Sequence, residues 1–217
     1  MTPRVLLLGI LLAGRLVSGA SAGEPGVTEA AMLFNGRDLT GWTLVASVAK
    51  DIHAVCRVTP DGVLAATGKP VGYLLADGTY ADYRLHAEWR WTSTNPQSNS
   101  GFLVHVSSGP IDRHTWPLCL QIQTKVGRAG DLIPMAGFAF AELPPGAKQT
   151  DRTQPASERP LGQWNICEII CRGDTVECTI NGVMQNRATG CSRRSGRIAI
   201  QLEGYPFELR NVRLEPL

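Results

Sequence analysis

The chain has 217 residues, and the 43% that are hydrophobic are enough to build a sizeable core. Its 21 basic and 19 acidic residues give a formal net charge of +2, with no basic stripe, acidic tail or basic amphipathic helix. This balance argues against nucleic acid and membrane surfaces as partners.

The N-terminal segment has the features of a signal peptide. Arg4 supplies a positive start, Val5 to Leu12 form an apolar run, and Ala20-Ser21-Ala22 is a small-residue cleavage site. The apolar run is shorter than the roughly 20 residues that span a bilayer. We therefore expect residues 1–22 to be removed, residues 23–217 to form a single domain, and the protein to be secreted or periplasmic, with no membrane span remaining.

Period-two alternation dominates the rest of the chain, whereas helical periodicity is scarce. Residues 83–91 alternate apolar and polar side chains, and residues 118–125 and 198–203 do the same. In a further strand, Phe102, Val104 and Val106 are expected on one face. Short alternating strands with Gly and Pro between them predict an all-β fold, a jelly-roll sandwich of two antiparallel sheets.

The strongest hairpin signal is Gly173-Asp174, which separates two alternating segments at 166–171 and 175–180. Cys167, Cys171 and Cys178 share the apolar face of these segments, so we expect them to be buried thiols. Cys56, Cys119 and Cys191 remain open to disulfide pairing, but the sequence does not identify partners.

Residues 137–163 interrupt this pattern. They contain four prolines among polar residues and show little periodicity. A long irregular connection in a compact domain is typical of a functional rim, and plain surface slack is the alternative.

Polar, hydrogen-bonding side chains repeat on the outward positions of four alternating strands. If those strands are neighbours, their side chains line one groove, and many directional hydrogen bonds are what sugar recognition needs. These residues are His86, Glu88, Arg90, His105, Gln121, Gln123, Lys125, Gln201 and Glu203.

Several short motifs resemble, in the same order, those of the 3-keto-disaccharide hydrolase domain family. They lie at residues 33–42, 88–90, 99–101, 116–123, 130–131, 164–165, 181–182, 196–198, 201–204 and 208–211. That family belongs to the concanavalin A-like lectin/glucanase superfamily. The resemblance implies a jelly roll with a sugar-binding groove. It also implies action on glycosides that a sugar 3-dehydrogenase has first oxidised to the 3-keto form.

The resemblance and the polar strand faces together give the candidate site. The resemblance places Arg90, Asn99, His105, Gln121, Gln123, Asp131 and Glu203 in the groove. The strand faces add Gln201 and Glu88 as substrate-binding residues. One departure matters: where relatives usually have Glu-x-Gln, this chain has Gln121-Ile122-Gln123, and an amide cannot act as a carboxylate base or acid.

The remaining acids, Glu88, Asp131 and Glu203, show no spacing that marks the carboxylate pair of a conventional glycosidase. A 3-keto sugar needs less, because its ketone acidifies the C2 proton and one base can remove it. We expect Glu203 or His105 as the base, Arg90 or Gln121 beside the enolate oxygen, and a divalent metal as an option at Asp131.

Two other readings stay open. Gln121 favours a non-catalytic carbohydrate-binding module on the same sandwich, since fold does not fix function. A structural domain with an unused groove is the third reading.

Overall fold

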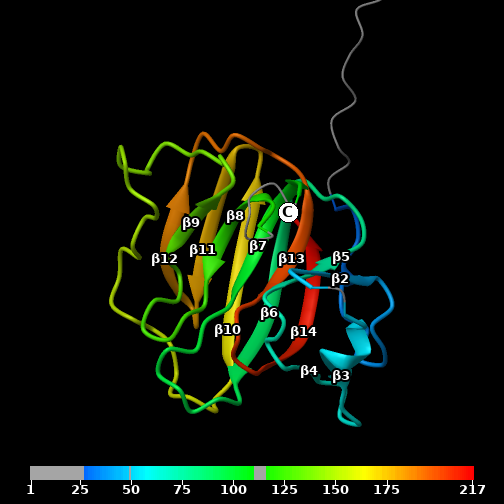
Figure 1. Cartoon of the computed structure of the whole chain (residues 1–217). Coiled ribbons are helices and arrows are strands. Elements are labelled where there is room, and N and C mark those ends of the chain that lie inside the picture. Colours follow the sequence, from blue (N-terminus) through cyan, green and yellow to red (C-terminus); the bar gives the residue numbers. More distant parts are fainter. Residues whose placement is uncertain (1–26, 49, 110–115) are drawn as a thin grey trace, which may run out of the picture.

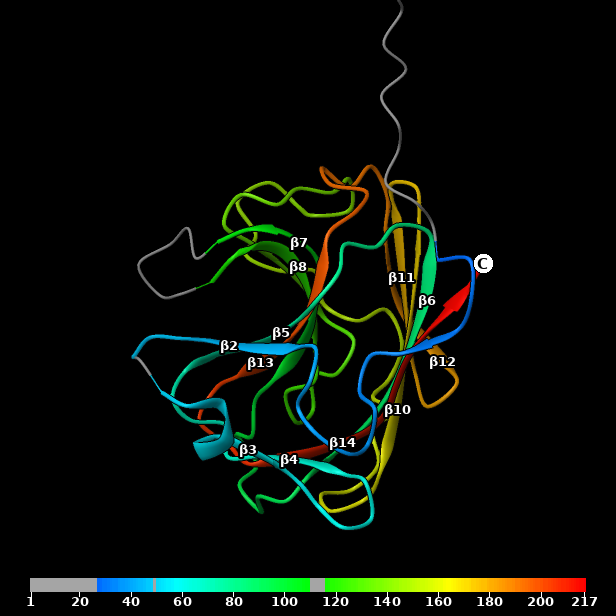
Figure 2. The same cartoon turned by 90° about the vertical axis from the view of Figure 1, so that its right-hand side faces the viewer.

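The computed structural model describes residues 27–48, 50–109 and 116–217, and the predicted signal peptide lies outside these residues. They form an all-β sandwich of two antiparallel sheets, which Figure 2 shows side by side. The fold class predicted from alternation is therefore confirmed. No helix within the described residues is long and apolar enough to cross a membrane.

The smaller sheet has six strands in the order β2-β5-β13-β7-β8-β9 (Figure 1). Their bounds are β2 Trp42–Ala46, β5 Gly72–Ala76, β7 Gly101–Ser108, β8 Leu118–Gln123, β9 Leu132–Met135 and β13 Arg197–Leu202.

The larger sheet has eight strands in the order β12-β11-β10-β6-β14-β4-β3, and β1 pairs with β14. Their bounds are β1 Ala31–Met32, β3 Cys56–Val58, β4 Leu64–Ala66, β6 Tyr83–Trp91, β10 Asn165–Arg172, β11 Thr175–Ile180, β12 Val183–Ala188 and β14 Phe207–Pro216. A short 3₁₀ helix, Ile52–Ala54, precedes β3.

The main core lies between the sheets and contains one apolar face of each strand. Leu85 and Ile169 of the larger sheet and Leu120 and Ile200 of the smaller one are all at most 2% exposed. Because side chains alternate along a strand, the residues between them point outward. On the smaller sheet, those outward positions also hold a second apolar cluster around Tyr73 and Leu103.

The predicted hairpin is confirmed. Strands β10 and β11 pair up to Arg172 and Thr175, so Gly173-Asp174 makes a two-residue turn. Cys167, Cys171 and Cys178 are buried and form no disulfide, as their positions on the apolar face predict.

One sequence-based expectation about strand neighbours is wrong. Strand β6, which carries His86, Glu88 and Arg90, was grouped with β7, β8 and β13, but it pairs with β10 and β14 in the larger sheet. Alternation shows which residues of a strand share a face, but it does not show which sheet the strand joins.

The expected face of Val106 is also wrong. Phe102 and Val104 belong to the main core, whereas Val106 packs in the outer cluster with Leu103. The register between β7 and its neighbours shifts in this region, and His105 has a left-handed backbone with φ 54°. Against β13, this part of β7 has one extra residue, as in a β-bulge, and an extra residue reverses the alternation beyond it.

Candidate functional site

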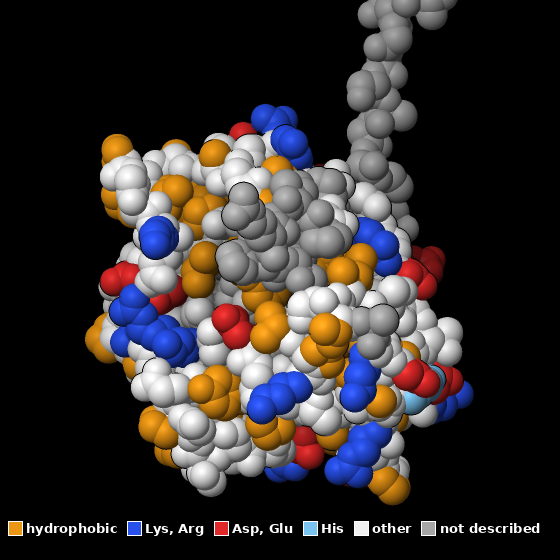
Figure 3. Space-filling model, in the orientation of Figure 1, with side chains coloured by type: hydrophobic (Ala, Val, Ile, Leu, Met, Phe, Trp, Pro, Cys, Tyr) orange, Lys and Arg blue, Asp and Glu red, His pale blue; other side chains and the backbone are white. Residues whose placement is uncertain are grey.

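A pocket of about 570 Å³ opens on the outward side of the six-stranded sheet. Figure 3 looks onto this sheet, and hydrophobic, basic and acidic side chains are interspersed on the face that it shows. The pocket brings together five residues predicted from the sequence: Asn99, Gln121, Gln123, Gln201 and Glu203. They lie on or next to β13, β7 and β8, which are adjacent strands.

Three glutamines form a connected chain of hydrogen bonds on the floor of this pocket. Gln121 Nε2 donates to Gln201 Oε1 at 2.9 Å and to Gln123 Oε1 at 3.2 Å. Gln123 Oε1 also accepts from the backbone N–H groups of Thr124 and Lys125, at 3.0 and 3.1 Å. All three glutamines are at most 6% exposed, so their hydrogen bonds form away from bulk water.

Two acceptor oxygens in the pocket are buried without a partner among the described residues. They are Oε1 of Gln121 and Oδ1 of Asn99. A buried polar atom without a hydrogen bond is costly, and at a pocket such atoms mark places for a ligand's donors. Acceptors on the protein select for hydroxyl or amine groups on a ligand.

Glu203 is the only carboxylate that lines the pocket among the described residues. Burial raises the pKa of Glu203, and the nearby positive charge of Lys125 opposes this only in part. A carboxyl group held in a pocket with a raised pKa takes up a proton more readily than an exposed glutamate does.

The irregular segment at 137–163 contributes to the pocket, so the rim interpretation is favoured over plain surface slack. Gly137, Phe138, Ala147 and Lys148 line the pocket. Trp116, Met135 and Phe138 add large apolar surfaces, which the sequence analysis did not assign to the site. Nothing in an aperiodic segment indicates where its side chains point.

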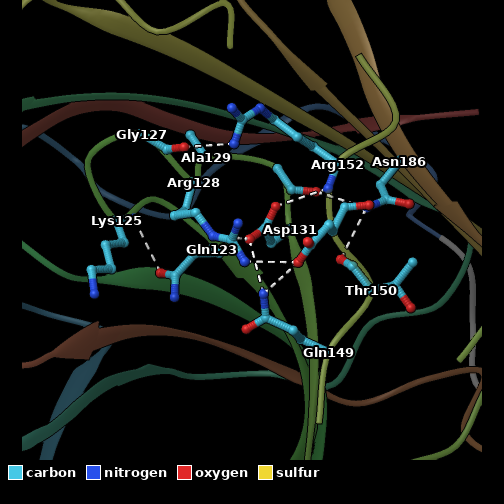
Figure 4. A network of polar contacts seen from close by, with 12 residues as sticks. Gln123, Lys125, Gly127, Arg128, Ala129, Asp131, Gln149, Thr150, Arg152 and Asn186 are labelled. Atoms are coloured by element: carbon cyan, nitrogen blue, oxygen red, sulfur yellow. Dashed lines mark hydrogen bonds and ion pairs between the residues drawn. The ribbon is translucent and has the colours of Figure 1, made fainter. Parts of the chain in front are cut away.

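Asp131 is not among the pocket-lining residues and has a different environment (Figure 4). Its carboxylate accepts hydrogen bonds from the backbone N–H of Arg152 at 2.8 Å and from Gln149 Nε2 at 3.1 Å. It also pairs with Arg128 Nε at 2.8 Å. Nitrogen donors thus face both oxygens, and the Arg128 guanidinium already supplies the positive charge beside one of them, so neither oxygen is left facing an open metal position.

No cluster of three or more His, Cys, Asp or Glu side chains suitable for a metal occurs within the described residues. We therefore derive no step through a metal at Asp131. Its carboxylate ties the turn after β8 to the segment around Arg152. A requirement of the reaction for a divalent metal stays a prediction, which incubation with a chelator tests.

Replacing Asp131 with Ala is expected to destabilise the fold by about 2 kcal/mol, because the partly buried Arg152 N–H loses its acceptor. Urea unfolding measures this. Asp151→Ala is the control, since Asp151 contacts Arg128 and Gln149 as well but its side chain is 63% exposed. That change should cost less than about 1 kcal/mol. Equal losses would contradict the assigned role.

Glu88 and Arg90 lie on the outward face of the larger sheet, on the opposite side of the sandwich from the pocket. Arg90 pairs with Glu208 at 2.6 Å, and its guanidinium lies over the Trp164 ring. Glu88 accepts hydrogen bonds from Arg210 and Asn211. Although burial alone would raise the pKa of Glu88, these hydrogen bonds lower it. We do not assign these two residues to the pocket.

His105 lies on β7 but not among the residues that line the pocket. It is 0% exposed, and its ring packs edge-to-face on Phe138 with 6.4 Å between the centroids. Burial lowers the pKa of His105 to about 4. Its ring contacts Phe138, which lines the pocket. Of the two predicted bases, Glu203 and His105, Glu203 is the one that lines the pocket itself.

The two-sheet jelly roll is the fold of concanavalin A-like glycosyl hydrolases and lectins. Residues 29–215 match the 3-keto-alpha-glucoside-1,2-lyase-like domain family, and the chain belongs to this carbohydrate-active family. No curated protein matches the chain in sequence.

Solved structures share the fold at low sequence identity. Two candidate glycosyl hydrolases from Parabacteroides distasonis ATCC 8503 superpose with TM-scores of 0.65 and 0.64, at 20% and 16% identity. Each match covers 87% of this chain, and 94% and 100% of the other chain, respectively. The carbohydrate-binding module CBM66 from Bacillus subtilis matches with a TM-score of 0.55 and 11% identity, over 81% of this chain and 96% of that one.

Proposed function

We propose that this protein cleaves 3-keto-glycosides by removing the C2 proton and eliminating the C1 substituent. The observation that carries the proposal is a pocket with one carboxylate of raised pKa, Glu203, beside buried amides that include two unpaired acceptor oxygens. Membership in a family described as 3-keto-alpha-glucoside-1,2-lyase-like supports it.

Glu203 is the base in this scheme. The C3 ketone acidifies the C2–H bond, whose electrons move into the C2–C3 bond as an enolate while the carboxylate takes the proton. The enolate then re-forms the ketone, a C1–C2 double bond forms, and the C1–O bond breaks. The departing oxygen receives a proton, which Glu203 can return. A conventional glycosidase needs two carboxylates, whereas this route needs one.

The developing enolate oxygen needs hydrogen-bond donors. Gln123 and Gln201 present Oε1 to Gln121, and no described residue is seen to accept a hydrogen bond from their Nε2 groups, which can donate to a ligand. Lys148 adds a positive charge at the pocket. Gln121, which its sequence context also suggested for this role, uses its own Nε2 within the protein.

Incubation with methyl 3-keto-α-glucoside and with unoxidised methyl α-glucoside tests the proposal by mass spectrometry. The keto sugar should lose methanol to give an unsaturated product or its hydrate, and the unoxidised sugar should remain intact. Exchange of the C2 proton with deuterated water would report the first step alone. A parallel incubation with a chelator tests for a metal. No change in the keto sugar would contradict the proposed reaction.

A non-catalytic carbohydrate-binding module is the second candidate. The observation that favours it is that Glu203 is the only pocket carboxylate in the described part of the chain, with Gln121 where relatives usually have Glu. In that case unoxidised sugars should bind with no product formed.

The proposal implies a place in a reaction sequence and a compartment. A 3-keto-glycoside must come from a glycoside whose C3 hydroxyl has been oxidised, so a sugar 3-dehydrogenase acts upstream. The apolar N-terminal run at residues 5–12 supports export of this protein, and its own step would then take place outside the cytoplasm.

A further inference from the structure

The orientation of the Gln121 amide is fixed by its neighbours. Its Nε2 faces two carbonyl oxygens, those of Gln123 and Gln201. If the amide turned over, its own Oε1 would face these two acceptors, and both hydrogen bonds would be lost. Amide orientations are assigned from such networks of donors and acceptors.

Gln123 cannot turn over to accommodate a different neighbour. Its Oε1 also accepts from the backbone N–H groups of Thr124 and Lys125. Turning it would point an NH₂ group at two N–H donors. The backbone therefore fixes the orientation of both amides. The two N–H groups orient the Gln123 amide, and Gln123 Oε1 in turn orients the Gln121 amide.

The consequence falls on the other atom of the amide. Gln121 is one of the residues that line the pocket, and its Oε1 is a buried acceptor that receives no hydrogen bond from the described residues. A bound molecule that places a hydroxyl there removes the penalty of the unpaired oxygen, and a molecule without that hydroxyl does not.

We propose that Gln121 determines specificity by accepting a hydrogen bond from one hydroxyl group of the bound sugar. This rests on the proposed function to the extent that the pocket takes a sugar. Gln121 is then a required amide and not a weakened form of a catalytic carboxylate, because the network around it is built for a donor.

Gly101 makes room for this arrangement. It lies on β7 opposite Gln123, and the Gln121 side chain lies directly over it. A methyl group at position 101 would be 2.6 Å from Gln121 Nε2 and 2.7 Å from its Cγ. Gly101→Ala should therefore displace Gln121 while leaving all three glutamines in the sequence.

Sugar analogues test the proposal. The ligands are methyl 3-keto-α-glucoside and its 2-, 4- and 6-deoxy forms, with KM measured where a sugar is turned over and Kd where it is not. In the wild type, one deoxy form should bind about 10-fold more weakly than the parent. Gln121→Met should weaken the binding of the parent sugar about 10-fold. It should then bind the parent and that same deoxy form equally well. Gly101→Ala should do likewise, and Gln163→Met, an exposed glutamine outside the pocket, should change neither value.

A second variant gives a readout that a purely structural role would not move. In Gln121→Glu, an ionised carboxylate would face the two carbonyl oxygens, whereas a protonated one restores a donor to them. Affinity for the parent sugar should therefore rise about 10-fold as the pH is lowered from 8 to 5, relative to the wild type at each pH.

The outcomes separate this inference from the proposed reaction. If the wild type turns over the keto sugar but Gln121→Met leaves every deoxy-sugar preference unchanged, only the inference about Gln121 is overturned. If Gln121→Met abolishes one such preference but the wild type turns over no sugar, only the lyase reaction is overturned. A wild-type protein that binds none of these sugars would overturn both.

Discussion

Replacing Glu203 with Gln should lower the turnover of a 3-keto-glucoside by about 10²–10⁴-fold, the usual contribution of a positioned general base. Glu203 is the only described carboxylate in the pocket, so no neighbouring acid can substitute for it. KM should change little, because the amide keeps the shape of the side chain. Glu29→Gln, an exposed acid away from the pocket, is the control.

The same substitution should not weaken the fold. Burial raises the pKa of Glu203, which means that the folded state disfavours its charged form. Above that raised pKa the charge destabilises the protein, and a neutral Gln removes the destabilisation. We expect the melting temperature of Glu203→Gln at neutral pH to equal or exceed that of the wild type. Loss of turnover together with a lower melting temperature would point to a structural role instead.

The pH profile adds a third check. A base works in its ionised form, so turnover should fall as the pH decreases through the pKa of Glu203. Because that pKa is raised, the fall should begin at a higher pH than the ordinary glutamate value of 4.5 would give. A rate that stays constant down to pH 4 would exclude Glu203 as the base.

How far the sequence predicts this pocket depends on the element. Gln121 and Gln123 alternate with the core residues Leu120 and Ile122, so period two is sufficient to place them outward. The hairpin around Gly173 and the buried cysteines followed from the same logic. In each case the information is local, carried by residues one or two positions apart.

The sequence-based expectations that are wrong or missing concern contacts between residues far apart in the chain. Residues 83–91 alternate as clearly as residues 118–123, yet β6 joins the larger sheet, and its outward residues face away from the pocket. Phe138 and Lys148 reach the pocket from a segment with no period at all. Which strands become neighbours is decided by the packing of the whole chain, and a single strand's pattern does not carry that information.

His105 shows a third kind of limit, because it lies at the irregularity of β7. A bulge is one extra residue, and nothing in the alternation of residues 102–107 reveals it. Its effect is to place an imidazole against Phe138, where neither ring nitrogen makes a well-aligned hydrogen bond within the described residues, although the Arg193 backbone lies close enough to favour the charged form. This placement leads to the second large prediction, which concerns stability in acid.

Wild-type stability should fall by about 3 kcal/mol between pH 7 and pH 4 through His105 alone. Burial lowers the pKa of His105 from 6.5 to about 4 and outweighs the Arg193 backbone and the Asp82 carboxylate, both of which favour the charged form. The folded state thus keeps His105 neutral, while the unfolded chain takes up a proton once the pH drops below 6.5. The free energy of unfolding therefore decreases as the pH falls from 6.5 to about 4, and His105 lowers it no further below that pH.

His105→Asn isolates this contribution, because Asn tolerates the left-handed backbone of this position and does not titrate in this range. The variant should be less stable than the wild type at pH 7, owing to the smaller side chain in a packed site. Its further loss between pH 7 and pH 4, measured by urea unfolding at each pH, should be smaller by about 3 kcal/mol. His53→Asn, at an exposed position, should keep the wild-type slope. Parallel curves for His105→Asn and the wild type would show that the imidazole is protonated as readily in the folded state as in the unfolded chain, and would contradict this prediction.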